Sequence, residues 1–235
     1  TIRECDFRTA TNQLYCVSSD GSFYIVNTAD ASATLVATLS PNNANSQLLD
    51  INPVADAFRW VGTDELNYAI TKNATGTFNT VAVQTPFAYV AGDVNAGKNP
   101  NLVAGAYDNN QNGLATTTFF TFDSATNQAA TIADRTATGS SNTGGGRLVT
   151  IGGVFDQNGQ VTITQNSGFD ITTSPQSNVN IGVLLTTAKL SFISTAQVPN
   201  IVTPGQTQNL SAFSQFVIGS DGNNLWADVM LPIQQ

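Results

Sequence analysis

Residues 5–26 carry the motifs Cys5-Asp6-Phe7 and Tyr15-Cys16-Val17, and the same pattern returns at residues 49–70 as Leu49-Asp50-Ile51 and Arg59-Trp60-Val61. Matched positions lie 44 residues apart throughout, with no gap in the register. A period of about 40–45 residues, built from short apolar runs between turn residues, is typical of one β-propeller blade. The repeat therefore predicts an all-β fold made of small antiparallel blades.

Weaker copies of the unit follow along the chain. Phe169-Asp170-Ile171 repeats Leu49-Asp50-Ile51, and further echoes fall at residues 118–125, 189–196 and 218–222. Residues 33–39 and 78–83 are expected to form the outer strands of the first two units. About twenty candidate strands predict one β-propeller domain over residues 1–235, with five four-stranded blades favoured and six or seven as alternatives.

The composition argues against several classes of partner. Only 10% of the 235 residues are charged, the net charge is −8, and the eight Lys and Arg residues are scattered along the chain. Binding to nucleic acid or to an anionic membrane surface needs a cluster of positive charge. No apolar run reaches the ~18 residues of a membrane-spanning helix. We therefore expect no nucleic-acid partner and no membrane insertion.

The two cysteines, Cys5 and Cys16, occupy the places of Leu49 and Trp60 in the second unit. If those places face each other on neighbouring strands, a disulfide between the cysteines is geometrically reasonable. A disulfide would indicate an oxidising compartment. The alternative is a pair of buried free thiols.

Two further features agree with a secreted, extracellular protein. The chain begins at Thr1 rather than Met, which fits a secretory protein whose leader has been removed; the alternative is a start chosen for expression. The tripeptides that begin at Asn73 and Asn209 are N-glycosylation sequons.

The chain also resembles a known family. Cys5-Asp6-Phe7-Arg8-Thr9-Ala10-Thr11-Asn12-Gln13-Leu14-Tyr15 resembles the opening signature of that family, and residues 50–56 with Arg59 resemble its D-x-N-P-x-x-D-x-x-R signature. Residues 122–126 and 168–171 resemble two further signatures. The family is a widespread group of secreted bacterial and fungal proteins known only as a domain of unknown function. The departures are Thr9, where the family usually has Pro, and the two cysteines.

Within this resemblance, the sequence is also similar to a narrower group, the pink chromoproteins of oyster mushrooms. That resemblance implies a small-molecule chromophore, either bound or derived from the chain itself. Neither resemblance implies a catalytic residue.

The chain contains no histidine, which restricts the chemistry that it can perform. Ser-His-Asp and Cys-His nucleophiles, His-bearing zinc sites and the usual general base near neutral pH are all absent. Carboxylates, amides and hydroxyls remain, and these hard oxygen ligands suit Ca²⁺ or Mg²⁺.

One candidate cation site is the run Asp108-Asn109-Asn110-Gln111-Asn112-Gly113. Its Asp108, Asn110 and Asn112 have the D-x-N-x-N-G spacing of a calcium loop. Position twelve of that loop, a bidentate Glu in an EF-hand, is Phe119, so a complete EF-hand is excluded. The alternative is an Asn-rich turn without an ion.

A second candidate site comes from the repeat, in which Asp6, Asp50 and Asp170 hold the same place between two apolar residues. On innermost strands these acids would converge on the channel, where they need a cation, ordered water or raised pKa values. The alternative is that each aspartate caps backbone N–H groups. Arg8 and Arg59 are candidates to neutralise the acids as ion pairs.

Candidate contacts for a small-molecule ligand are Trp60, Trp226, Arg59 and Asn224. Trp60 aligns with Cys16, whereas Trp226 lies beside polar residues near the closing strand. Core packing is the alternative for both tryptophans.

The leading hypothesis is a non-enzymatic secreted propeller that binds a small molecule, as a pigment-carrying chromoprotein does, with a bound Ca²⁺ or Mg²⁺. One alternative is a metal-dependent lyase or hydrolase that uses channel carboxylates. The other is a structural or surface-interaction module. The sequence leaves room for a homodimer and does not settle whether the protein is an enzyme.

Overall fold

The computed structural model describes residues 1–63, 65–133, 135–136, 139–140, 145–187, 189–199 and 201–217 of the chain. Its regular structure is almost all β, with one short 3-10 turn, η1 (Thr195–Gln197). Within these ranges no helix has the length and hydrophobicity that a membrane crossing requires.

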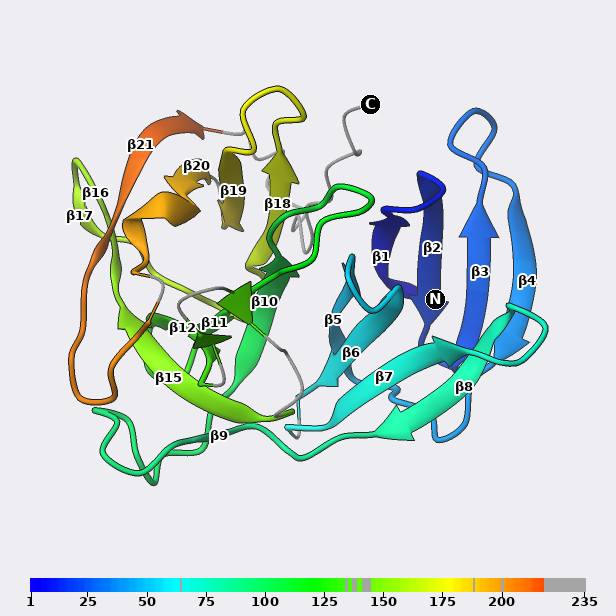
Figure 1. Ribbon diagram of the computed structural model, residues 1–235, viewed down its shortest axis with the longest axis horizontal. Coiled ribbons are helices and arrows are strands. Elements are labelled where there is room, and N and C mark those ends of the chain that lie inside the picture. Colours follow the sequence, from blue (N-terminus) through cyan, green and yellow to red (C-terminus); the bar gives the residue numbers. More distant parts are fainter. Residues whose placement is uncertain are drawn as a thin grey trace.

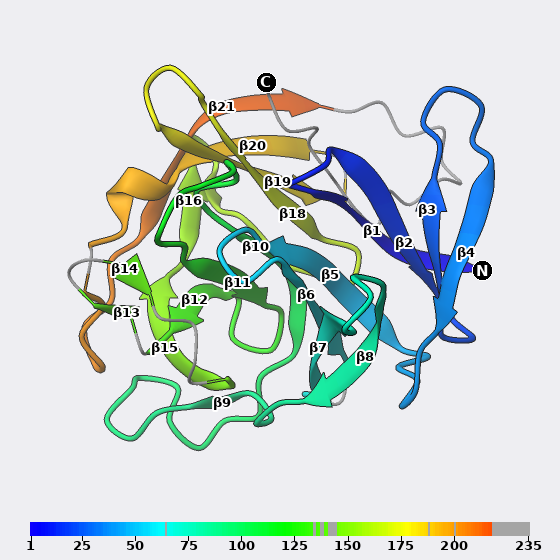
Figure 2. The ribbon, with the colours of Figure 1, turned by 45° about the vertical axis from the view of Figure 1, so that its right-hand side comes forward.

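The strands form four main sheets that stand side by side as the blades of a propeller (Figures 1 and 2). Blade 1 consists of β1 (Ile2–Arg8), β2 (Gln13–Ser18), β3 (Ser22–Val26) and β4 (Ala33–Thr38), in that order. Blade 2 consists of β5 (Ser46–Asn52), β6 (Ala57–Gly62), β7 (Asn67–Lys72) and β8 (Phe78–Val83). Neighbouring strands within each blade are antiparallel, so each blade is an up-and-down sheet.

Blades 3 and 4 carry additional outer strands. Blade 3 has the order β10 (Leu102–Tyr107), β11 (Phe119–Asp123), β12 (Gln128–Ile132), β15 (Arg147–Gly152) and β9 (Ala88–Tyr89). Blade 4 has the order β18 (Gly168–Thr173), β19 (Asn180–Thr186), β20 (Lys189–Ser194), β21 (Leu210–Val217), β16 (Val154–Asp156) and β17 (Gly159–Gln160). A separate hairpin pairs β13 (Arg135–Thr136) with β14 (Gly139–Ser140).

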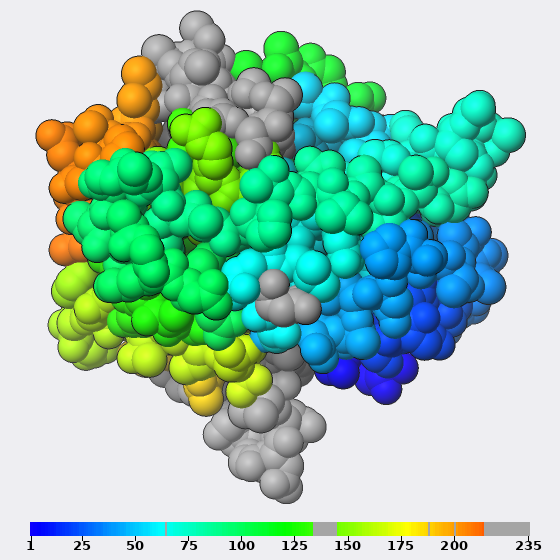
Figure 3. Space-filling model, turned by 90° about the horizontal axis from the view of Figure 1, so that it is seen from below, coloured from blue at the N-terminus to red at the C-terminus, as the bar shows by residue number. Residues whose placement is uncertain are grey.

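The predicted β-propeller is confirmed, but the favoured number of five blades is wrong, because the described strands form four. Dividing the number of strands by four gives too many blades, because β9, β16 and β17 extend existing blades and β13 and β14 form a separate hairpin. β9 and β16 pair in parallel with β15 and β21. The segment that contributes β9, residues 84–101, crosses from blade 2 to blade 3 on the face shown in Figure 3.

The 44-residue repeat corresponds to blades 1 and 2, and both predicted outer strands are confirmed as β4 and β8. Residues 118–125 repeat the pattern of residues 22–29, which include the third strand of blade 1, but β11 is the second strand of blade 3. The likeness arises from a shared turn. Asn27 Oδ1 accepts a hydrogen bond from Ala29 N–H, and Asp123 Oδ1 accepts one from Ala125 N–H. Such a side-chain turn follows a strand of any rank.

The hydrophobic core lies between neighbouring blades. Between blades 1 and 2, ring centroids of Tyr15, Phe23, Phe58 and Phe78 lie 5.1 to 5.5 Å apart. Between blades 3 and 4, Phe122 meets the ring of Phe169 edge-on at 4.6 Å. Each such buried ring contributes about 1.5–3 kcal/mol. Apolar packing therefore sets the angle between blades and holds their inner strands close together.

An ion-pair cluster joins blades 1 and 2. Arg8 donates from Nε and Nη2 to the two carboxylate oxygens of Asp56, at 2.7 and 2.6 Å. Lys72 also binds this carboxylate. The hydrogen bonds from Arg8 lead the causes that lower the pKa of Asp56 from 3.8 to about 2.

We predict that Asp56→Asn destabilises the protein by about 1 kcal/mol near neutral pH, after allowance for solvent screening. A carboxylate with a lowered folded-state pKa stabilises the fold above its unfolded pKa of 3.8 and loses that contribution as the pH falls toward 2. Urea unfolding of both proteins should therefore show a difference that shrinks over this range. In a double-mutant cycle with Arg8→Met, most of the stability lost in Asp56→Asn should be found to come from the interaction with Arg8. A difference that does not change with pH would contradict the assignment.

Candidate cation site on the propeller axis

The inner strands of all four blades line one small cavity on the propeller axis. Its lining includes Glu4 and Asp6 from β1, Gln47 and Asp50 from β5, Gly105 from β10 and Asp170 from β18. Its volume is about 10 Å³, which is room for a single water molecule or ion. None of the described residues that line it carries a positive charge.

The three aspartates of the repeat meet at this cavity. Asp6, Asp50 and Asp170 are 5%, 3% and 3% exposed. One carboxylate oxygen from each lies within 4.8 Å of those from the other two. The acids come together because they hold equivalent positions on the inner strands. On the next strand of the same blade, Asp6 faces Tyr15, Asp50 faces Arg59 and Asp170 faces Val183.

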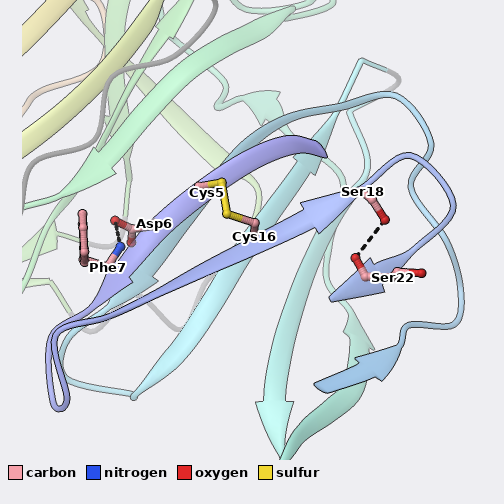
Figure 4. The surroundings of a disulfide bond; sticks show 6 residues. All are labelled: Cys5, Asp6, Phe7, Cys16, Ser18 and Ser22. Atoms are coloured by element: carbon pink, nitrogen blue, oxygen red, sulfur yellow. Dashed lines mark hydrogen bonds between the residues drawn. A yellow bond between two sulfur atoms is a disulfide. The ribbon is translucent and has the colours of Figure 1, made fainter. Parts of the chain in front are cut away.

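Backbone N–H groups fix these carboxylates. Asp6 Oδ2 accepts a 2.6 Å hydrogen bond from Ile51 N–H of blade 2, and Asp50 Oδ1 accepts one of 2.9 Å from Tyr107 N–H of blade 3. Each of these aspartates therefore binds the inner strand of the next blade. Asp6 Oδ1 also accepts the N–H of its neighbour Phe7 at 2.7 Å, as Figure 4 shows.

Blade 3 departs from this pattern, and the sequence alone did not reveal how. The hydrogen bond to Tyr107 N–H and the pairing of Ala106 with Phe120 place Ala106 at the position of the aspartate. The methyl side chain of Ala106 has no oxygen that could accept an N–H group of blade 4. The equivalent donor there, Ile171 N–H, instead binds the Oδ1 of its own neighbour Asp170 at 2.6 Å. The cluster therefore has three acids around four inner strands.

This arrangement suits a hard cation. Three carboxylates this close repel one another in a buried site, and a cation or shared protons must offset that repulsion. The backbone donors favour the ionised carboxylates. Gln47 Oε1, which lines the same cavity, is buried without a hydrogen-bond partner among the described residues. The donors present, carboxylate and amide oxygens, fit Ca²⁺ or Mg²⁺.

The two arginines expected to neutralise these acids have other partners. Arg8 pairs with Asp56, as described above. Arg59 donates from Nε to the hydroxyl of Tyr107 at 2.6 Å and from Nη1 to Asn67 Oδ1 at 2.5 Å. Its guanidinium lies over the rings of Phe87, Tyr107 and Phe119, 5.1 to 5.8 Å from their centroids. Arg59 is therefore a cation enclosed between blades 2 and 3, and the prediction that it contacts a ligand does not fit this position.

Trp60 is also part of the core, a position that does not fit the prediction that it contacts a ligand. Its side chain is fully buried, its indole N–H donates to Ser46 Oγ at 2.8 Å, and its ring packs against Tyr68. The core-packing alternative describes it correctly. Trp226 and Asn224, the other two candidate contacts, lie outside the described residues.

The Asn-rich loop gives its three candidate ligands different surroundings. Asp108 Oδ1 accepts the N–H of Thr118 at 2.6 Å, which closes the loop on itself. Asn110 donates from Nδ2 to the carbonyl of Ile171 in blade 4, while Asn112 is exposed. Asn110 Oδ1 is buried without a partner among the described residues. Loop closure and the contact between blades explain Asp108 and the Asn110 amide without an ion.

A disulfide joins Cys5 and Cys16, with an S–S distance of 2.03 Å, so the predicted pairing is confirmed (Figure 4). The two residues face each other on β1 and β2, in the register that Leu49 and Trp60 have in blade 2. The disulfide thus fixes β1 to β2 at the residue before Asp6.

The two sequons lie at surface connections between strands. Asn73 lies in the turn between β7 and β8, and Asn209 is exposed before β21.

We predict that the double variant Cys5→Ala/Cys16→Ala folds but loses about 2–4 kcal/mol of stability, because the cross-link restricts the unfolded chain. Urea unfolding measures the loss, and a thiol assay on the denatured parent protein should find no free cysteine. Equal stability of the two proteins would show that the disulfide adds nothing to the fold.

Comparison with known proteins settles the family. The family model described as "Domain of unknown function (DUF4394)" matches residues 1–219. The chain belongs to this family. This confirms the expected membership of a domain-of-unknown-function family, while the narrower likeness to chromoproteins stays an expectation. No curated protein matches the sequence.

Several solved structures are similar in fold. The Dos1 propeller shares 12% identity, with a TM-score of 0.48, over 85% of this chain and 46% of its own. An auxiliary nutrient binding protein from Bacteroides ovatus shares 11%, with a TM-score of 0.49, over 77% and 44%. A putative 6-phosphogluconolactonase from Bacteroides uniformis shares 12%, with a TM-score of 0.47, over 92% and 57%. The chain thus spans about half the length of these structures, and likeness at this level carries no argument about function.

Proposed function

We propose that this chain is a non-enzymatic, extracellular binding propeller whose axis holds one Ca²⁺ or Mg²⁺ ion between Asp6, Asp50 and Asp170. The observation that carries the proposal is the convergence of three buried carboxylates, with oxygens within 4.8 Å of one another, on a cavity of about 10 Å³. The ion would offset their repulsion and link blades 1, 2 and 4 at their inner strands. The disulfide supports the extracellular assignment.

The size of the cavity favours binding over catalysis. A volume of about 10 Å³ has room for one ion or water molecule and none for an organic substrate beside it. Asp6 and Asp50 also hold backbone N–H groups of the next blade, which restricts their movement. These features favour a structural cation over the metal-dependent lyase or hydrolase considered from the sequence.

We predict that Asp50→Asn and the parent protein exchange their order of thermal stability when Ca²⁺ is added. An asparagine keeps the oxygen that accepts Tyr107 N–H but removes one negative charge. In chelator the variant should be at least as stable as the parent, because repulsion is relieved. In excess Ca²⁺ the parent should gain about 5–10 °C in Tm and overtake the variant. Thermal unfolding in EDTA, Ca²⁺ and Mg²⁺ measures this, and elemental analysis of the native protein gives the bound metal.

Asp30→Asn, at an exposed turn in blade 1, is the matched control and should respond to Ca²⁺ as the parent does. A parent Tm that is the same in EDTA, Ca²⁺ and Mg²⁺, together with metal-free native protein, would rule out the axial ion. The aspartates would then act only as acceptors for backbone N–H groups.

We also propose, from the resemblance to chromoproteins, that the protein carries a pigment, and this has a separate test. A bound or self-derived chromophore would give the native protein an absorbance band in the visible range, beyond the ultraviolet band of its tryptophans and tyrosines. We expect such a band, and expect it to disappear from the protein fraction after denaturation if the chromophore is not covalently attached. A colourless native protein would remove the chromoprotein assignment and leave the axial cation unaffected.

A further inference from the structure

A groove of about 460 Å³ lies on blade 4 and shares no lining residue with the axial cavity. Its lining comes from β16, β17 and the segment that follows them, together with Thr186, Thr187 and Lys189. Its lining combines four threonines, two amide side chains, one oppositely charged pair and one valine: Thr162, Thr164, Thr186, Thr187, Asn158, Gln160, Asp156, Lys189 and Val161. None of these described residues is aromatic.

The segment 161–164 presents its threonines to the groove. Val161 and Ile163 are 6% and 4% exposed, whereas Thr162 is exposed and Thr164 partly so. This alternation is that of an extended strand, yet the segment belongs to no sheet. Val161 N–H binds the carbonyl of Val154, and Ile163 N–H binds Asn127 Oδ1, so the segment is fixed from its inner side. Its outer side remains available for a ligand.

Three threonine hydroxyls of the groove have no hydrogen-bond partner in the part of the chain that the structure describes. Within the described ranges, the Oγ1 atoms of Thr162, Thr186 and Thr187 make no intramolecular hydrogen bond. A threonine hydroxyl both donates and accepts, as sugar hydroxyls do.

Charge in the groove is balanced. Lys189 Nζ lies 3.4 Å from Asp156 Oδ2, and Asp156 Oδ1 also accepts the N–H of Asn158. A balanced pair gives no net attraction for an anion or a cation, so a neutral ligand fits best. The absence of a described aromatic wall disfavours a flat pigment, which would bind by stacking.

We propose that this groove binds a neutral carbohydrate of one or two sugar rings through the hydroxyls of Thr162, Thr186 and Thr187. The site goes beyond the axial cation and is independent of it. Recognition by hydrogen bonds alone, without stacking, predicts weak binding in the millimolar range.

The test uses the full chain with glucose, cellobiose and N,N′-diacetylchitobiose as probes. Saturation-transfer NMR and calorimetry should detect at least one of these sugars, and its affinity should be the same in EDTA and in Ca²⁺. The double variant Thr162→Val/Thr187→Val should weaken that binding about tenfold, because two hydrogen bonds are lost. Thr34→Val, at an exposed threonine of β4, should bind as the parent does.

Three results would overturn the proposal. The first is that none of the three sugars binds at millimolar concentration. The second is that binding persists unchanged in the double variant while its unfolding curve matches that of the parent. The third is that a neutral extended peptide competes for the groove more strongly than any of the sugars, which would assign the exposed segment to strand pairing instead.

Discussion

The structure depends on one contact made twice at its centre, an inner-strand aspartate that accepts a backbone N–H from the next blade. The inner strand of a propeller blade leaves one edge without a neighbouring strand, and its N–H groups need partners there. Asp6 and Asp50 supply those partners at Ile51 and Tyr107. Because each acid reaches forward to the next blade, the contact also brings the acids together. The same geometry that satisfies the strand edges thus creates the charge cluster that a cation would neutralise.

Much of the fold could be predicted from the sequence because blades 1 and 2 repeat the same pattern at a constant spacing of 44 residues. The pairing of Cys5 with Cys16 and the shared place of Asp6, Asp50 and Asp170 were both read from that register. These features are properties of a repeat position, which a sequence records directly. The convergence of the acids needed only the further assumption that equivalent positions meet at an axis.

The sequence-based predictions failed for residues whose contacts are not determined by their position in the repeat. Trp60 and Arg59 carry side chains suited to ligands, but neighbouring blades enclose both, and no local pattern shows which face a blade covers. Ala106 could not be assigned because it follows Asp50 by 56 residues (106 − 50) instead of 44, since the segment 84–101 lengthens the connection from blade 2 to blade 3. The extra strands were counted as a fifth blade, since a short parallel edge strand has the same composition as any other strand.

The outermost strands of blades 3 and 4 have a consequence for how the protein folds. β9 precedes β10 in the chain but pairs with β15, so the contact of Ala88 with Arg147 joins residues that are 59 positions apart (147 − 88). Blades 1 and 2 need no such partner, and all their strand pairs join chain neighbours. Contacts between residues close in sequence form sooner than distant ones. The amino-terminal half is therefore the natural place for folding to begin, with β9 and β16 added last to their edges.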